Sequence, residues 1–113
     1  MYIEAIVFMG YETLARKSNS QLEKLIRNTA KDTKTVVITV HAGVRMRRRK
    51  VSSLEIYECL QNGNIRQQPE PNDAKGSLEC RMERYVAGRN IAVVAAICDE
   101  DPDVIVVTVF TIN

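Results

Sequence analysis

The sequence is poor in several residue types that identify classes of protein. It has no tryptophan, four tyrosines and two phenylalanines, so a broad stacking platform for single-stranded nucleic acid is not expected. Its cysteines, Cys59, Cys80 and Cys98, are odd in number and form no CxxC pair. We expect reduced thiols buried as small hydrophobic groups. A zinc site combining them with His41 would need ligands from widely separated elements, so we expect no metal and no cofactor.

Long apolar runs are also absent. No stretch approaches the roughly 20 apolar residues of a membrane-spanning helix. Residues 1–9 are largely apolar but contain Glu4 and no basic residue, unlike a signal peptide. We therefore expect a cytoplasmic protein without membrane association. Residues 3–8 could form either a strand or the first turn of a helix.

The chain has the length and composition of one globular domain, residues 1–113, with 45% hydrophobic residues. The net charge of +2 argues against a protein that coats polyanions throughout. The charges are unevenly distributed, however, because residues 45–50 are basic and residues 99–103 are acidic. A local anion-binding patch is therefore the supportable prediction.

Two capping boxes predict helices in the first half. Ser20-Gln-Leu-Glu23 predicts a helix from near Ser20, and Ser52-Ser-Leu-Glu55 predicts another that ends in a left-handed stop at Asn62-Gly63. The β-branched residues 35–39 predict a strand, and residues 42–49 a short helix. The buried side of the helix after Ser52 is expected to use four residues: Leu54, Ile56, Tyr57 and Leu60.

Strand patterns dominate the last third. Residues 78–86 alternate, and residues 91–97 and 104–111 are apolar on both faces. Before them, residues 65–68 are predicted as a brief strand and residues 69–76 as a loop. A turn is expected at residues 87–90, and burial is expected for Val93, Val94, Ile97, Val106 and Val109. We predict an α+β fold with N-terminal helices packed on a curved antiparallel sheet.

A candidate catalytic group follows the first predicted strand. His41, Arg45 and Arg49 are spaced i, i+4 and i+8, so a helix would place them along one side. A histidine base beside a guanidinium clamp for phosphate suits phosphodiester cleavage through a 2′-hydroxyl. The simpler alternatives are a capping or packing histidine and a solvated helix face, which is the interpretation preferred for Arg47 and Arg48.

Two further candidates lie on the predicted strand 78–86. Arg81 and Glu83 share its polar face, where a salt bridge is the simpler interpretation. In a catalytic role, Arg81 would contact a second phosphate and Glu83 would assist proton transfer. Tyr85 could stack on a base.

The motif His41-Ala42-x-x-Arg45-Met46-x-x-Arg49 resembles the H-A-x-x-R-M-x-x-R signature of a small prokaryotic family, a domain of unknown function. The similarity extends over residues 35–111 and implies that Met46 faces inward. That family commonly has glycine after the last arginine, where this chain has Lys50.

More distantly, the family resembles RelE- and MqsR-type ribonuclease toxins, which place helices against a curved antiparallel sheet, a RelE/barnase-like fold. Such toxins cleave RNA without metal and are neutralised by an antitoxin. The resemblance therefore implies a metal-independent endoribonuclease with RNA and an antitoxin-like protein as partners. The C-terminal catalytic arginine or tyrosine of many RelE-type toxins has no clear counterpart in residues 108–113.

Two other functions fit the same residues. One is a non-catalytic accessory module that binds RNA or an acidic protein through the basic helix 42–50. The other is a structural or phage-type accessory protein whose arginines are only solvated. The sequence also leaves open whether the chain forms a homo-oligomer.

Overall fold

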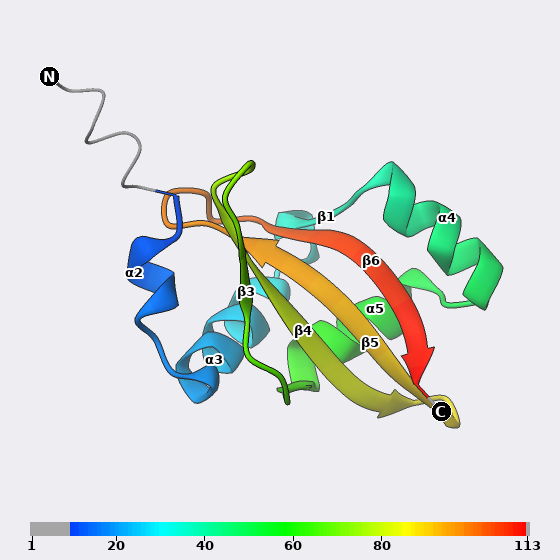
Figure 1. Cartoon of the computed structure of the whole chain (residues 1–113). Coiled ribbons are helices and arrows are strands. Elements are labelled where there is room, and N and C mark those ends of the chain that lie inside the picture. The colour runs from blue at the N-terminus through cyan, green and yellow to red at the C-terminus, as the bar shows by residue number, and fades with distance from the viewer. Residues whose placement is uncertain (1–9, 113) are drawn as a thin grey trace, which may run out of the picture.

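The computed structural model describes residues 10–112, so the prediction for residues 3–8 lies outside the described part (Figure 1). Its helices are α2 (Glu12–Ala15), α3 (Asn19–Ala30), α4 (Val40–Arg49) and α5 (Ser53–Asn62), with a 3-10 turn at Thr33–Thr35. Its strands are β1 (Val36–Ile38), β2 (Asn64–Ile65), β3 (Glu70–Asn72), β4 (Ser77–Val86), β5 (Arg89–Ile97) and β6 (Val104–Ile112). No helix in this range is long and apolar enough to cross a membrane.

The strands form one sheet in the order β1-β6-β5-β4-β2, with β3 also paired to β4. The long strands β4, β5 and β6 form the predicted antiparallel meander. The expectation of a wholly antiparallel sheet is wrong at one edge, because β1 pairs with β6 in parallel. Helices α4 and α5 separate β1 from the meander in sequence, which gives the chain enough length to return in the same direction. The α+β class is confirmed.

One face of the sheet carries the hydrophobic core. Helices α3 and α5 cover this face, as Figure 1 shows. Alternation along β4 sends Leu78, Cys80 and Met82 into the core, as predicted. The core also contains Leu22, Ile26, Ile56, Leu60, Ile91, Val93, Val104, Val106 and Val109. The burial predicted for Val94 is wrong in degree, because this side chain faces the opposite side and is only half-buried.

The first capping box lies two residues earlier than predicted. Ser18 accepts a hydrogen bond from the backbone N–H of Gln21, whose side chain accepts one from the Ser18 N–H. Glutamine thus takes the role assigned to Glu23, which instead accepts a hydrogen bond from the Ile65 N–H at 2.7 Å. The second box, Ser52 with Glu55, is confirmed.

Several other local predictions are wrong. The strand predicted at residues 65–68 is β2 at Asn64–Ile65, so it shares only Ile65 with the prediction. Leu54 is 75% exposed, because it precedes the buried stripe of α5. Gly63 has φ −77°, so it ends α5 without a left-handed residue. A Cβ at Gly63 would come within 2.3 Å of the Cys59 carbonyl oxygen, so close packing explains the glycine. The predicted loop 69–76 contains β3, which pairs with β4 through residues 70–72.

Candidate functional site

Helix α4 carries three candidate residues and begins at a capping threonine. Thr39 Oγ1 accepts a hydrogen bond from the Ala42 N–H at 3.1 Å and donates to the Val106 carbonyl oxygen at 2.9 Å. One hydroxyl thus caps the helix and ties its first turn to β6. Ala42 is fully buried, and Met46 packs against the core, as the resemblance implied for Met46. The helix is therefore firmly attached at its start.

The end of α4 is fixed by a Schellman motif. The Val51 N–H bonds to the Met46 carbonyl oxygen at 2.9 Å, and the Lys50 N–H bonds to that of Arg47 at 3.4 Å. Lys50 adopts a left-handed conformation with φ 56°. This conformation favours glycine because it brings a Cβ close to the backbone.

Arg89 at the start of β5 strengthens that end. Its guanidinium donates to the carbonyl oxygens of Arg49, at 2.7 Å, and Lys50. Its Nη2 also lies 3.5 Å from a Glu55 carboxylate oxygen, which links α4 to the first turn of α5. Sequence reasoning missed this residue, because nothing in the chain near position 89 indicates that it reaches α4.

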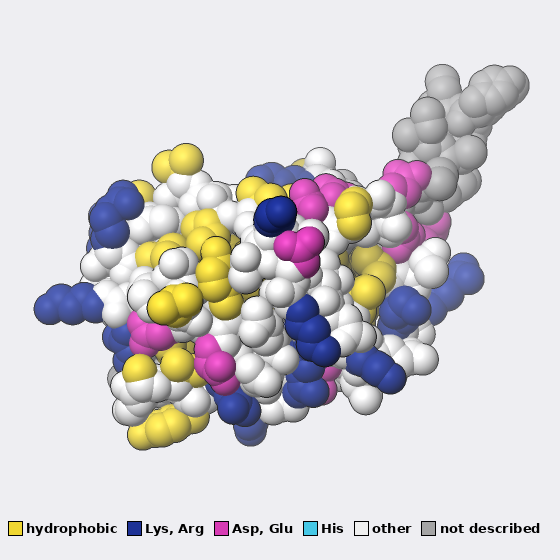
Figure 2. Space-filling model, turned by 180° about the vertical axis from the view of Figure 1, so that it is seen from behind, with side chains coloured by type: hydrophobic (Ala, Val, Ile, Leu, Met, Phe, Trp, Pro, Cys, Tyr) yellow, Lys and Arg dark blue, Asp and Glu magenta, His cyan; other side chains and the backbone are white. Residues whose placement is uncertain are grey.

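The cations of α4 and its cap have no acidic partner in the described part of the chain. Arg45 is half-buried, whereas Arg47, Arg48, Arg49 and Lys50 are exposed. Within residues 10–112, none of the five forms an ion pair, although other arginines do. Figure 2 shows cationic side chains projecting from the end of the molecule that α4 occupies. The predicted basic patch is thus available to an anion.

His41 lies in the first turn of α4 and lines a cavity of about 540 Å³. Its imidazole shares the wall with carboxylates, a lysine and apolar side chains; the lining residues include Asn72, Lys75, Ser77, Glu79, Asp101, Asp103, Ile105 and Val107. Arg45 and Arg49 do not line this cavity. The histidine therefore connects the basic helix to a recess that contains three carboxylates, on the sheet face that α3 and α5 leave uncovered.

Arg81 and Glu83 form the salt bridge that the sequence allowed. Arg81 Nε lies 3.0 Å from Glu83 Oε2, and the guanidinium lies 4.5 Å from the centre of the Phe110 ring. Arg66 approaches the same carboxylate at 3.9 Å. Across the described range, no hydrogen bond or ion pair joins Arg81 or Glu83 to His41, Arg45 or Arg49. The five candidate residues therefore fall into two separate groups. His41, Arg45 and Arg49 lie on α4, and Arg81 and Glu83 pair on β4.

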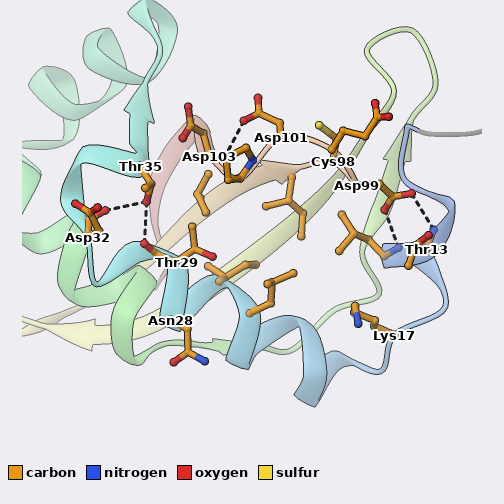
Figure 3. Close-up of a pocket in the computed structure, with 17 residues that line it drawn as sticks. Thr13, Lys17, Asn28, Thr29, Asp32, Thr35, Cys98, Asp99, Asp101 and Asp103 are labelled. Atoms are coloured by element: carbon orange, nitrogen blue, oxygen red, sulfur yellow. Dashed lines mark hydrogen bonds between the residues drawn. The ribbon is translucent and has the colours of Figure 1, made fainter. Parts of the chain in front are cut away.

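A larger cavity, of about 840 Å³, lies on the other side of the loop between β5 and β6 (Figure 3). Asp99 shapes its wall by accepting hydrogen bonds from the backbone N–H groups of Thr13 and Leu14, each at 3.0 Å. This carboxylate caps α2 from a distant part of the chain. The sequence showed only that residues 99–103 are acidic and did not indicate this cap, since the contact is not local.

Cys59 and Cys80 are buried, as predicted, whereas the burial predicted for Cys98 is wrong, because this residue is only partly buried in the loop after β5. Burial raises the pKa of the Cys59 and Cys80 thiols to about 12, so both stay protonated near neutral pH. Over residues 10–112, no three histidine, cysteine or acidic side chains gather as a metal site.

Comparison with known proteins places the chain in a family. No curated protein and no solved structure matches it. A family model described as "Domain of unknown function (DUF4258)" matches residues 38–111, which run from the last residue of β1 through α4, α5, β4 and β5 to the penultimate residue of β6. Because the match covers well over half of the 113 residues, the chain belongs to the DUF4258 family.

Proposed function

We propose that the protein is a metal-independent, RelE-like endoribonuclease, the toxin of a cytoplasmic toxin–antitoxin pair. The observation that carries the proposal is helix α4, which presents arginines without acidic partners in the described residues beside His41 at a cavity mouth. An RNA strand supplies the phosphates that such a cluster attracts.

In the proposed reaction, His41 removes the proton of a 2′-hydroxyl and that oxygen attacks the adjacent phosphorus. Arg45 and Arg49 stabilise the charge that builds on the phosphate oxygens. The 5′-oxygen leaves and takes a proton from solvent water, and the other product ends in a 2′,3′-cyclic phosphate. Arg81 and Glu83 contribute only where RNA opens their mutual salt bridge, which makes them the less supported part of the site.

The test is an RNA cleavage assay on purified protein freed of partners, in the presence of a chelator and with and without ribosomes. We expect products with 2′,3′-cyclic phosphate ends. His41→Ala should lower the rate by about 10²–10⁴, the range for a lost general acid or base. Arg16→Ala, which removes an exposed cation at the end of α2, serves as the control.

Absence of cleavage under all these conditions would refute the enzymatic proposal. A second function, a non-catalytic binding module, is favoured by one observation: Arg81 and Glu83 pair with each other, and within residues 10–112 neither forms an ion pair with another candidate residue. Salt-sensitive RNA binding without cleavage would support that function. In either case we expect an antitoxin-like protein with an acidic segment to cover α4.

A further inference from the structure

The cavity beside His41 has features that the cleavage reaction does not use. It lies on the sheet face that α3 and α5 leave uncovered, between the start of α4, the β3–β4 hairpin and the β5–β6 loop. Its volume of about 540 Å³ is within the usual range of small-molecule sites. Strand alternation directs Ala96 and Ile105 toward it, opposite the core. One wall is therefore flat and apolar.

The polar groups of the cavity favour a ligand that donates hydrogen bonds. Glu79, Asp101 and Asp103 line it, against Lys75 and His41. Three carboxylates disfavour a phosphate here, in contrast to the exposed side of α4. If RNA is the ligand, its phosphates would therefore lie along α4, and a different part of the RNA would enter the cavity.

Ser77 provides an independent sign of a ligand. It is 8% exposed, it lines the cavity, and its hydroxyl has no hydrogen-bond partner among the described residues. An unsatisfied buried hydroxyl costs about 1–3 kcal/mol, which a polar group seated against this wall would recover.

We propose that this cavity binds a guanine base of RNA, with Glu79 as the residue that recognises it. The inference rests on the proposed function in taking RNA as the ligand. The side-chain amide of Asn72 donates to Glu79 Oε2 at 3.1 Å and holds the carboxylate in place. Its oxygens retain further lone pairs for a ligand.

The choice of guanine follows from the edges of the bases. Guanine alone presents two neighbouring N–H donors, at N1 and the 2-amino group, which match the two oxygens of a carboxylate. Adenine and cytosine place an acceptor next to their amino group, and uracil places an acceptor on each side of its N–H. The Ser77 hydroxyl and Lys75 can donate to the guanine O6, while Ile105 and Val107 contact the ring.

His41 lines the same cavity and lies in the first turn of α4, so a guanosine seated there would present its ribose and phosphate to His41 and the arginines. The site would thus select the nucleotide at which the backbone is cut. This selection requires both parts of the site: the cavity, which binds the guanine base, and the basic helix, which contacts the phosphate.

The test is calorimetric titration of the full-length protein with GMP, IMP, AMP, CMP and UMP. IMP differs from GMP only by lacking the 2-amino group. We expect GMP to bind at least about tenfold more tightly than IMP, since one hydrogen bond to a charged group is lost. Glu79→Gln should reduce GMP affinity to that for AMP, and Glu100→Gln, a matched change outside this cavity, should not.

The outcomes are separable from those of the cleavage assay. Guanine selectivity that Glu79→Gln abolishes supports the inference, whether or not the protein cleaves RNA. Equal affinity for all five nucleotides, or for GMP and IMP, overturns it without reference to any variant and leaves the cleavage assay to decide the proposed function. Unchanged GMP affinity in Glu79→Gln also overturns it.

Discussion

The side chain of Arg89 is hydrogen-bonded to the backbone of Arg49: Arg89 Nη1 donates to the Arg49 carbonyl oxygen at 2.7 Å. The last carbonyls of a helix have no partner within the helix, so a cation at this position satisfies them and interacts favourably with the helix dipole. A cation that supports the end of α4 thus helps to place a helix crowded with other cations.

We predict that Arg89→Ala lowers the free energy of unfolding by about 1–3 kcal/mol, because carbonyl groups lose charged donors and Glu55 loses its ion-pair partner. Urea denaturation measures this change. Arg84→Ala is the control, since Arg84 forms an exposed pair with Glu58 worth about 0–1 kcal/mol. Equal effects of the two substitutions would contradict a special role for Arg89.

Lys50 gives a second prediction, from backbone conformation. Its φ of 56° is strained for any residue with a Cβ, and glycine removes the strain. Lys50→Gly should raise the free energy of unfolding by about 1 kcal/mol. Lys50→Ala removes the same charge but keeps the Cβ, so the difference between the two variants in urea denaturation isolates the conformation. A glycine variant no more stable than the alanine variant would refute this explanation.

Glu55 gives a prediction about acid. Hydrogen bonding to the backbone of Ser52, with its hydroxyl and Arg89 assisting, lowers the pKa of Glu55 below its ordinary 4.5. Since the folded pKa is below the unfolded one, the stabilisation is complete above the unfolded pKa and is lost as pH falls through the folded pKa. We expect Glu55→Gln to flatten the dependence of unfolding free energy on pH below about 5.

Thermal denaturation at a series of pH values would measure this effect, with Glu70→Gln as the control for loss of one exposed carboxylate. An unchanged slope in Glu55→Gln would show that the capping box does not contribute to acid stability.

Local signals predicted most of the elements. The capping box at Ser52, the β-branched run before Thr39 and the alternation along β4 each depend on neighbours in sequence, and the structure has all three. Ser20 was misassigned because Ser18 offers the same hydroxyl two residues earlier, with Gln21 in place of glutamate. Short-range patterns thus predict that a helix exists more reliably than they predict the residue at which it begins.

Contacts between distant segments could not be predicted in this way. Parallel pairing of β1 with β6, the Asp99 cap on α2 and the reach of Arg89 to α4 each join residues far apart in the chain. The sequence placed His41 on the basic helix, but only the fold brings Glu79 to the same cavity. That is why sequence reasoning selected Arg81 and Glu83, which pair with each other, and overlooked Glu79.

The last prediction concerns RNA affinity. Each phosphate that a cation neutralises releases counterions, so the logarithm of the binding constant falls linearly with the logarithm of salt concentration. Replacing Arg45 and Arg49 together by alanine should lower that slope by about two units, one for each lost contact. Filter binding of a short RNA at several salt concentrations measures the slope. Arg16, at the end of α2, and Lys24, on α3, are exposed cations outside α4. Replacing both by alanine provides a control with the same change in net charge. An affinity indifferent to salt, or an equal loss of slope in the control, would show that α4 is a solvated surface and not an RNA contact.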